Sequence, residues 1–243
     1  MIDLNTAVSQ IVRSDYRTAD VFKKHGINYC CGGNASLREA CDLKKLSATQ
    51  IAIELEDAVQ SISLPASVRF DEWPLDFLID YILHVHHTHV KKTTGPLQGM
   101  IRNFAEAHKA KYPHMLRVAD AFENFADVLL EHMQKEEASI FPYVRQVLSM
   151  HSRKDSFASL FVRTLAKPLE QVAEMEHRRI AAYLKELREL TGHYSYTPSV
   201  CTNHQVIYHK LKEFDADMVQ HKHLENNILF PKVILMEREL LHL

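Results

Sequence analysis

The sequence predicts an all-α protein in which a small helical domain is followed by a four-helix bundle. Two observations favour helices: the 243 residues include 6 glycines, too few for a turn-rich β sandwich or barrel, and apolar residues recur at helical spacing over long stretches. A third observation, 16 histidines, indicates metal chemistry. The 29 basic and 31 acidic residues leave a formal charge of −2 at pH 7, which argues against binding to nucleic acid or to an anionic membrane surface.

Residues 1–64 are expected to form a small N-terminal domain of short amphipathic helices. Between the second and third helix lies the stretch 26–34, whose glycines are able to end a helix and to adopt positive φ. Within it, residues 30–33 read Cys-Cys-Gly-Gly. Proline and small residues at Ser63–Ser67 mark a linker, so the bundle is predicted to occupy residues 65–243. The four short helices are predicted near Thr6–Arg13, Arg17–His25, Ala35–Lys45 and Thr49–Ile62.

Four long helices with short connections are predicted in the second part of the chain. Acidic residues and a proline at Asp71–Pro74 suit the start of the first one, which is expected to break at Thr94–Pro96. Gly192 is a normal signal for the end of the third. Four-helix bundles build metal and cofactor sites in their interior. The predicted helices are Leu75–Thr93 with a continuation towards Lys111, Pro113–Met150, Pro168–Leu190, and Asn203 to the end.

An internal repeat selects the candidate metal ligands. The pair His132 and Glu136 recurs as His221 and Glu225, and each pair is followed by Phe-Pro and a valine at the same spacing, with a constant offset of 89 residues. A duplicated helix pair demands an equivalent residue on the two other helices, and the histidines His87 and His177, 90 residues apart, meet that demand. Residues i and i+4 lie on one helix face, so each His and Glu can aim at one ion or at two neighbouring ions.

The resulting set of four imidazoles and two carboxylates predicts a dinuclear site. If both glutamates bridge, each ion receives two nitrogens and two carboxylate oxygens, and a bridging oxo or hydroxo group leaves one position open for a small molecule. Mixed imidazole and carboxylate ligands suit iron, whereas structural zinc commonly takes thiolates, and calcium and magnesium take oxygen. Because the set is richer in nitrogen than ferritin-like sites, binding or reducing a diatomic gas fits better than iron storage.

Two assignments near this set stay open. The ligand on the first long helix is either His86 or His87, because both lie on neighbouring stripes of one helix face. His108 is either a group that supports a ligand from behind or a surface residue, and His86 is the other candidate for such a supporting role.

The cysteines indicate thiol chemistry rather than disulfides. The four cysteines do not form a CxxC pair, and the start of the chain has no signal-peptide pattern, so reduced thiols and a cytoplasmic location are expected. No segment approaches 18 uncharged apolar residues, which argues against a membrane protein. Cys30 or Cys31, near glycines, is interpreted as a thiol of lowered pKa that handles electrons, iron or a nitrosyl group, the alternative being simple packing. Cys41 and Cys201 are expected to be structural.

Several of these motifs together resemble those of a known family. Cys-Cys-Gly-Gly at 30–33, Lys135-Glu136-Glu137 and the stretch 224–227, with Phe-Pro after each glutamate, resemble the repair-of-iron-centres proteins, the YtfE and ScdA group. The resemblance implies a hemerythrin-like bundle with two iron ions held by four histidines and two bridging glutamates. One departure is that family members often have Tyr-His where this chain has His86-His87. Matched by position, the implied ligands are His87, His132, Glu136, His177, His221 and Glu225.

The resemblance implies repair or protection of iron–sulfur clusters under nitrosative and oxidative stress. The leading hypothesis is that the protein binds nitric oxide or dioxygen at the iron ions and reduces nitric oxide, with Glu136 and Glu225 neutralising and tethering the ions. The alternatives are an iron donor to damaged iron–sulfur proteins and a gas sensor without turnover. Whether the protein is a nitric oxide reductase-type enzyme, which reductant it uses and whether it forms a homodimer are left open by the sequence.

Overall fold

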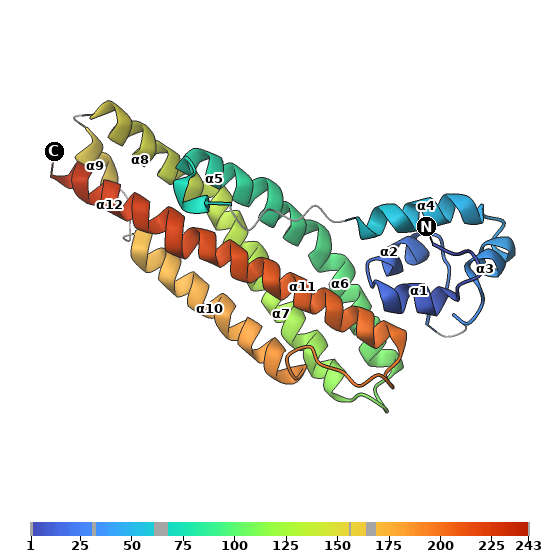
Figure 1. Cartoon of the computed structure of the whole chain (residues 1–243). Helices are drawn as coiled ribbons and strands as arrows, with labels where there is room; N and C mark the ends of the chain where they lie inside the picture. Colours follow the sequence, from blue (N-terminus) through green and yellow to red (C-terminus); the bar gives the residue numbers. More distant parts are fainter. Residues whose placement is uncertain (1, 31–32, 61–67, 156, 164–168, 243) are drawn as a thin grey trace. The chain divides into compact units, whose positions relative to one another are not determined.

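The computed structural model describes residues 2–30, 33–60, 68–155, 157–163 and 169–242, and its described elements are helices (Figure 1). The side chains of residues 170–174 are not described either. Extended backbone pairing within these ranges is confined to a single bridge between Ala7 and Ser36. The all-α prediction is therefore confirmed. Among the described helices, none has both the length and the apolar character needed to span a membrane.

The chain divides into two compact units, residues 1–66 with 194–213, and residues 67–193 with 214–243. The first unit contains the predicted short helices, with ends that differ from the predicted ones by one to three residues where they can be compared. Residues 61–67, which hold the predicted linker, lie outside the described residues, so the boundary at residue 64 stays a prediction. The helices of residues 1–66 are α1 (Val8–Ser14), α2 (Thr18–Lys24), α3 (Leu37–Leu43) and α4 (Ala48–Val59).

Local sequence signals begin these short helices, and burial holds them together. Ser36 and Glu39 form a capping box at α3, in which the Glu39 N–H donates to the serine Oγ and the Ser36 N–H donates to the carboxylate. Ser47 caps α4 by accepting from the Gln50 N–H. Helices this short are marginal alone, so their stability comes from a shared core. The fully buried members of that core include Val8, Phe22, Leu37 and Leu55.

Two glycines shape the loop that follows α2. Gly26 has φ of +64°, the left-handed conformation with which a helix commonly ends. Gly33 is needed for a different reason, since a Cβ there would lie 2.4 Å from the carbonyl oxygen of Tyr29. The carbonyl of Gly33 accepts a hydrogen bond from the Ser9 N–H at 2.8 Å, so this end of the loop is fastened to α1. Cys31 and Gly32 lie outside the described residues.

The first unit also includes the residues that open the last long helix. Tyr16 stacks on His209 with ring centroids 5.0 Å apart, and Lys210 donates to Asp20 at 2.6 Å. Residues 194–213, which were predicted to belong to the bundle, therefore belong to the same compact unit as the N-terminal helices. The helical periodicity of the sequence did not indicate this.

The second unit contains the long helices, apart from residues 202–213 of the fourth, and three of them are assembled from shorter helical segments. The first is α5 (Leu75–Tyr81), η2 (Ile82–His87) and α6 (Thr88–Ala107), preceded by a short 3-10 turn, η1 (Phe70–Glu72). The second is α7 (His114–Lys135), η3 (Glu136–Ile140) and α8 (Phe141–Arg153), followed by the short α9 (Ala158–Val162). The third is α10 (Leu169–Leu190), and the fourth is α11 (Thr202–Leu224), η4 (Glu225–Leu229) and α12 (Phe230–Leu241).

The predicted break at Thr94–Pro96 is wrong, because α6 continues through both Gly95 and Pro96 (Figure 1). Pro96 removes one helical hydrogen bond, a cost of about 3 kcal/mol in a helix interior. Both residues lie on the exposed face, while Thr94 and Leu97 are buried. Burial of that face, together with the hydrogen bond from Thr94 Oγ1 to the Val90 carbonyl, holds the helix together through the proline.

Three of the four long helices are interrupted by π-helical turns, which the sequence analysis did not predict. They are η2, η3 and η4, and each begins or ends at a candidate ligand: His87, Glu136 or Glu225. A π turn inserts one extra residue into an α-helix and is frequent at functional sites. In η3 and η4 the turn is followed at once by Phe-Pro, at 141–142 and 230–231. Proline has no N–H to donate to the carbonyl four residues earlier, so it favours a local departure from regular α geometry.

Apolar side chains on both sides of these turns form the core of the second unit. One side contains Leu78, Ile79, Ile82 and Val144 with the residues that pack on them. The other contains aromatic rings, among them Phe122, Phe125 and Phe214, whose centroids lie 5.5–6.2 Å apart. Ionised groups between such layers are costly to bury unless they are paired or bind metal.

Candidate metal centre

The structure brings all six ligands implied by the sequence into one buried cluster. Two overlapping groups of four have ligand atoms within 4.8 Å of one another, and Glu136 and Glu225 belong to both. All six side chains are at most 4 % exposed. The two groups are His87, Glu136, His221 and Glu225, and His132, Glu136, His177 and Glu225.

The contacts within the cluster follow the internal repeat. Nε2 of His132 lies 3.1 Å from Glu136 Oε1, and Nε2 of His221 lies 3.0 Å from Glu225 Oε1. The other oxygen of each glutamate faces a histidine of another helix. Nε2 of His87 lies 3.4 Å from Glu136 Oε2, and Nε2 of His177 lies 3.2 Å from Glu225 Oε2. The two glutamates thus lie between two pairs of imidazoles.

The charges of the cluster are mutually dependent. Burial alone would raise the pKa of Glu136, but the imidazoles of His132, His177 and His87 outweigh it and hold that pKa well below its usual range. Burial alone would lower the pKa of His177, but Glu136 and Glu225 raise it to about 10. In the metal-free chain, the raised pKa values of His177 and His221 therefore keep protons beside the two carboxylates. A metal ion that binds must displace such protons.

The geometry fits metal ions better than it fits a network of hydrogen bonds. Buried atoms without a hydrogen-bond partner include both carboxylate oxygens of Glu136, Oε2 of Glu225 and Nε2 of His87. Leaving buried polar atoms unsatisfied costs about 1–3 kcal/mol each. Nε2 of His132 and Nε2 of His177 lie 3.3 Å apart, the separation expected for two nitrogens roughly 2.1 Å from one shared ion.

Outer partners fix the orientation of two of the imidazoles, and the sequence analysis missed both partners. Nδ1 of His87 lies 2.8 Å from Glu137 Oε1, and Nδ1 of His177 lies 2.5 Å from Asn226 Oδ1. A ligand histidine commonly uses its second nitrogen in this way, which sets its tautomer. Positions 137 and 226 have the same offset of 89 as the ligands, so extending the repeat by one residue would have identified them.

The phenylalanines of the two Phe-Pro sequences pack on the same imidazoles. Phe141 lies 5.7 Å from the His87 ring and Phe230 lies 6.0 Å from the His177 ring, measured between ring centroids. Both phenylalanines are at most 4 % exposed. The two phenylalanines of the repeat supply no ligand atom themselves, and they therefore serve to position the ligand histidines.

His87, and not His86, is the residue of the first long helix whose nitrogen joins the cluster. His86 is also buried, and its ring stacks on His221 with centroids 5.6 Å apart. Its Nδ1 lies 2.9 Å from Asp217 Oδ1. His86 therefore packs behind a ligand, as the supporting role proposed for it requires.

Of the two roles left open for His108, the structure places this residue away from the clustered side chains. His108 follows the end of α6, 21 residues after His87, which corresponds to about 30 Å along a helix axis. Its ring stacks on Phe104 at 4.3 Å between centroids, and its Nδ1 contacts the Phe104 carbonyl.

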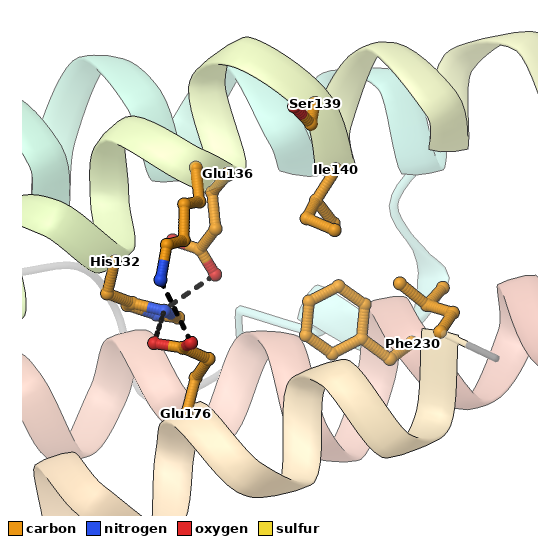
Figure 2. Close-up of a pocket in the computed structure, with 8 residues that line it drawn as sticks. His132, Glu136, Ser139, Ile140, Glu176 and Phe230 are labelled. Carbon is orange, nitrogen blue, oxygen red and sulfur yellow. Dashed lines mark hydrogen bonds and ion pairs between the residues drawn. The ribbon is translucent and has the colours of Figure 1, made fainter. Parts of the chain in front are cut away.

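A cavity of about 210 Å³ adjoins one side of the cluster (Figure 2). His132 and Glu136 line it from the cluster, and Ile140, Leu169 and Phe230 supply an apolar wall. Figure 2 shows Ile140 and Phe230 directed towards the same space, with Glu176 opposite Glu136. Glu176 also pairs with Lys135, Nζ to Oε1 3.2 Å, so an ion pair forms part of the cavity lining.

Comparison with known proteins identifies the family. The family model described as "Hemerythrin HHE cation binding domain" matches residues 78–233, which include all six clustered side chains. The chain belongs to the hemerythrin HHE cation-binding family. A second family model, ScdA_N, described as a domain of unknown function (DUF542), matches residues 4–59.

Relatives of this hemerythrin-family chain resemble it over nearly its full length. It is 28 % identical to the iron-sulfur cluster repair protein ScdA of Staphylococcus haemolyticus, over 96 % of this chain and 99 % of the relative. It is 25 % identical to the iron-sulfur cluster repair protein YtfE of Yersinia pestis, over 90 % and 91 % of the two chains. The predicted membership of the YtfE and ScdA group is thereby confirmed.

The cysteines of this hemerythrin-family chain differ in exposure. Cys30 is partly exposed, and its N–H donates to Asn28 Oδ1 at 3.0 Å, while Cys31 lies outside the described residues. The role predicted for this pair therefore stays a prediction. Cys41 is buried, and burial raises the pKa of its thiol, in agreement with a structural role.

Proposed function

We propose that the chain is a dinuclear non-haem iron protein that repairs or protects iron–sulfur clusters by binding and reducing nitric oxide. The observation that carries the proposal is the sharing of Glu136 and Glu225 by two buried groups of four ligands. A single ion would fill only one of the two overlapping ligand groups. Two neighbouring ions that share both carboxylates would use all six side chains.

The ligand chemistry favours iron. Each position offers two imidazole nitrogens and two carboxylate oxygens, without a thiolate. Oxygen-rich sites suit calcium, magnesium and manganese, and thiolate-rich sites suit zinc, so a mixed nitrogen and oxygen set favours iron. The names of the relatives, iron-sulfur cluster repair proteins, agree with this assignment and suggest damaged iron–sulfur proteins as the targets.

When bound, two ferrous ions supply the two electrons that convert two nitric oxide molecules and two protons into nitrous oxide and water. The residues of the chain perform the other tasks. Glu136 and Glu225 would neutralise two of the four positive charges of a ferrous pair and two of the six of a ferric pair, while the histidines would act as neutral donors. His87 and His177, oriented by Glu137 and Asn226, would present their Nε2 atoms to the ions.

The cavity suits a small uncharged substrate. Its wall of Ile140, Leu169 and Phe230 favours apolar diatomic molecules, and its volume of about 210 Å³ has room for two of them. Nitric oxide is therefore favoured as the substrate, and dioxygen is the competing ligand of the same chemistry.

Metal analysis and product analysis of the purified full-length chain test the proposal together. We expect two iron ions per chain, visible charge-transfer bands of an oxo-bridged pair in air, and repeated nitrous oxide formation from nitric oxide with a chemical reductant. Glu136→Ala should lose both iron and turnover, whereas the exposed control Glu131→Ala should keep both, because Glu131 pairs with Lys135 and not with the cluster.

Two outcomes would contradict parts of the proposal. One zinc per chain, or one iron, would exclude the dinuclear iron centre. Nitrosylation that stops at one nitric oxide per iron without nitrous oxide would exclude reduction. In the second case, iron that a chelator removes rapidly and that reactivates a cluster-depleted enzyme without nitric oxide would establish an iron donor instead.

A further inference from the structure

The two halves of the metal centre differ in charge at one pair of equivalent positions. Most contacts of the cluster repeat faithfully, including the His-to-Glu distances of 3.1 and 3.0 Å and the Phe rings on His87 and His177. At the offset of 89 residues, however, Glu137 corresponds to Asn226. A carboxylate on one side of the centre is thus replaced by a neutral amide on the other.

Both side chains contact a ligand in the same way. Oε1 of Glu137 lies 2.8 Å from Nδ1 of His87, and Oδ1 of Asn226 lies 2.5 Å from Nδ1 of His177. Each imidazole therefore donates its Nδ1–H outwards and keeps Nε2 for the interior. The remaining two ligands do not offset the difference. Nδ1 of His221 has no hydrogen-bond partner, and Nδ1 of His132 lies 3.9 Å from Glu176, beyond hydrogen-bond distance.

An imidazole that donates to a carboxylate is a stronger ligand than one that donates to an amide. The anion stabilises positive charge on the ring, so Nε2 donates more electron density to the metal, and loss of such a partner typically costs 10–100-fold in metal affinity. Lys91 lies 2.7 Å from both oxygens of Glu137 and reduces this effect without removing it, since the pair is partly exposed to water. The charge near His132 is compensated likewise, because Glu176 pairs with Lys135.

The cavity adds a second difference between the halves. Its lining includes His132, which belongs to the half with Asn226, and includes neither His87 nor His221. Through this cavity, a small molecule or a chelator reaches the half with the weaker outer partner.

We propose that Glu137 and Asn226 make the two metal positions unequal, with a tight position at His87 and His221 and an exchangeable, ligand-accepting position at His132 and His177. This proposal rests on the dinuclear centre proposed above and adds to it which position exchanges and which residues decide it. Neither residue touches the metal, and both act as positioning residues through the histidines.

The test is a titration of the metal-free full-length chain with Co²⁺, followed by the visible absorption of bound cobalt in competition with a chelator. We expect two binding steps for the natural chain. Glu137→Gln should weaken the tighter step at least tenfold, and Asn226→Asp should tighten the weaker step at least tenfold, so that the two steps draw together. The matched controls Glu106→Gln and Asn103→Asp, exposed changes of the same chemistry on α6, should alter neither step.

The outcomes separate this proposal from the centre on which it rests. Binding of fewer than two Co²⁺ by the natural chain removes the dinuclear centre itself. Two bound Co²⁺ with Glu137→Gln acting on the weaker step, or on both steps equally, overturns the assignment of positions. If Glu137→Gln does not fold, as circular dichroism would reveal, Asn226→Asp decides alone, and its failure to tighten the weaker step overturns the proposal.

Discussion

At the residue scale, the centre depends on which nitrogen of each histidine faces inwards. In His87 and His177, Nδ1 contacts Glu137 and Asn226, and Nε2 faces the two shared glutamates. Without metal, the same arrangement favours the protonated form of His177. The pKa of His177, ordinarily 6.5, is about 10 because the nearby carboxylates Glu136 and Glu225 outweigh the effect of burial.

The stability of the metal-free chain should therefore fall at alkaline pH. A histidine whose folded pKa is raised stabilises the fold fully below its unfolded pKa, 6.5, and this contribution is lost as pH rises through about 10. We expect the free energy of unfolding in urea to decrease by about 1–3 kcal/mol between pH 6.5 and 9.5 beyond the change common to all lysines and tyrosines. His177→Gln should lack this extra decrease, and equal pH dependence of the two chains would contradict the assignment.

Residue types and spacing were enough to predict the ligands, but not their surroundings. The offset of 89 residues selected His132, Glu136, His221 and Glu225, and the structure brings these together. The choice between His86 and His87 needed the structure, because both side chains are buried and a shift of one residue on a helix turns a side chain by about 100°. His108 shows a different limit, because its distance from His87 follows only once α6 is known to continue through the predicted break at Thr94–Pro96.

At the scale of elements, the sequence predicted the effect of proline on helix geometry at the wrong positions. The sequence analysis expected Pro96 to break a helix, yet α6 continues through it. Pro142 and Pro231 were recognised as parts of the repeat but not as signs of altered helix geometry, yet each follows a π turn that begins at a shared glutamate. Tertiary packing decides between these outcomes: the exposed Pro96 is tolerated by a helix with a buried face, whereas the other two prolines coincide with buried ligands.

Replacing Pro142 by alanine should weaken metal binding. Alanine restores an N–H that can donate to the Ala138 carbonyl, so regular α geometry becomes accessible to residues 136–140. Removing the extra residue of a π turn would rotate Glu136 relative to Phe141 by about 100°. We expect about tenfold weaker Co²⁺ binding with unchanged far-ultraviolet circular dichroism.

Pro96→Ala is the control for this experiment. It makes the same chemical change in an exposed position of a continuous α-helix, so it should increase the free energy of unfolding and leave Co²⁺ binding as in the natural chain. If Pro142→Ala also left binding unchanged, the π turn would be held by the packing of Phe141 on His87 and not by the proline.

At the scale of the whole molecule, the two compact units divide the chemistry between them. All six clustered ligands belong to the second unit, and the Cys-Cys-Gly-Gly sequence belongs to the first. The sequence predicted this division of residue types, because the helical module and the bundle carry different motifs. It did not predict that residues 194–213 join the first unit, since the contacts of Tyr16 with His209 and of Asp20 with Lys210 join residues about 190 positions apart.

The division predicts that thiol and metal functions can be separated by mutation. A chain with Cys30→Ser and Cys31→Ser should bind two Co²⁺ with natural affinity, because the six clustered side chains supply the ligands of both proposed ion positions. If the thiols handle iron or a nitrosyl group during repair, the same chain should restore a damaged iron–sulfur enzyme several-fold more slowly than the natural chain. Cys201→Ser controls for the loss of a thiol, and equal repair rates for all three chains would show that the metal centre acts without the cysteine pair.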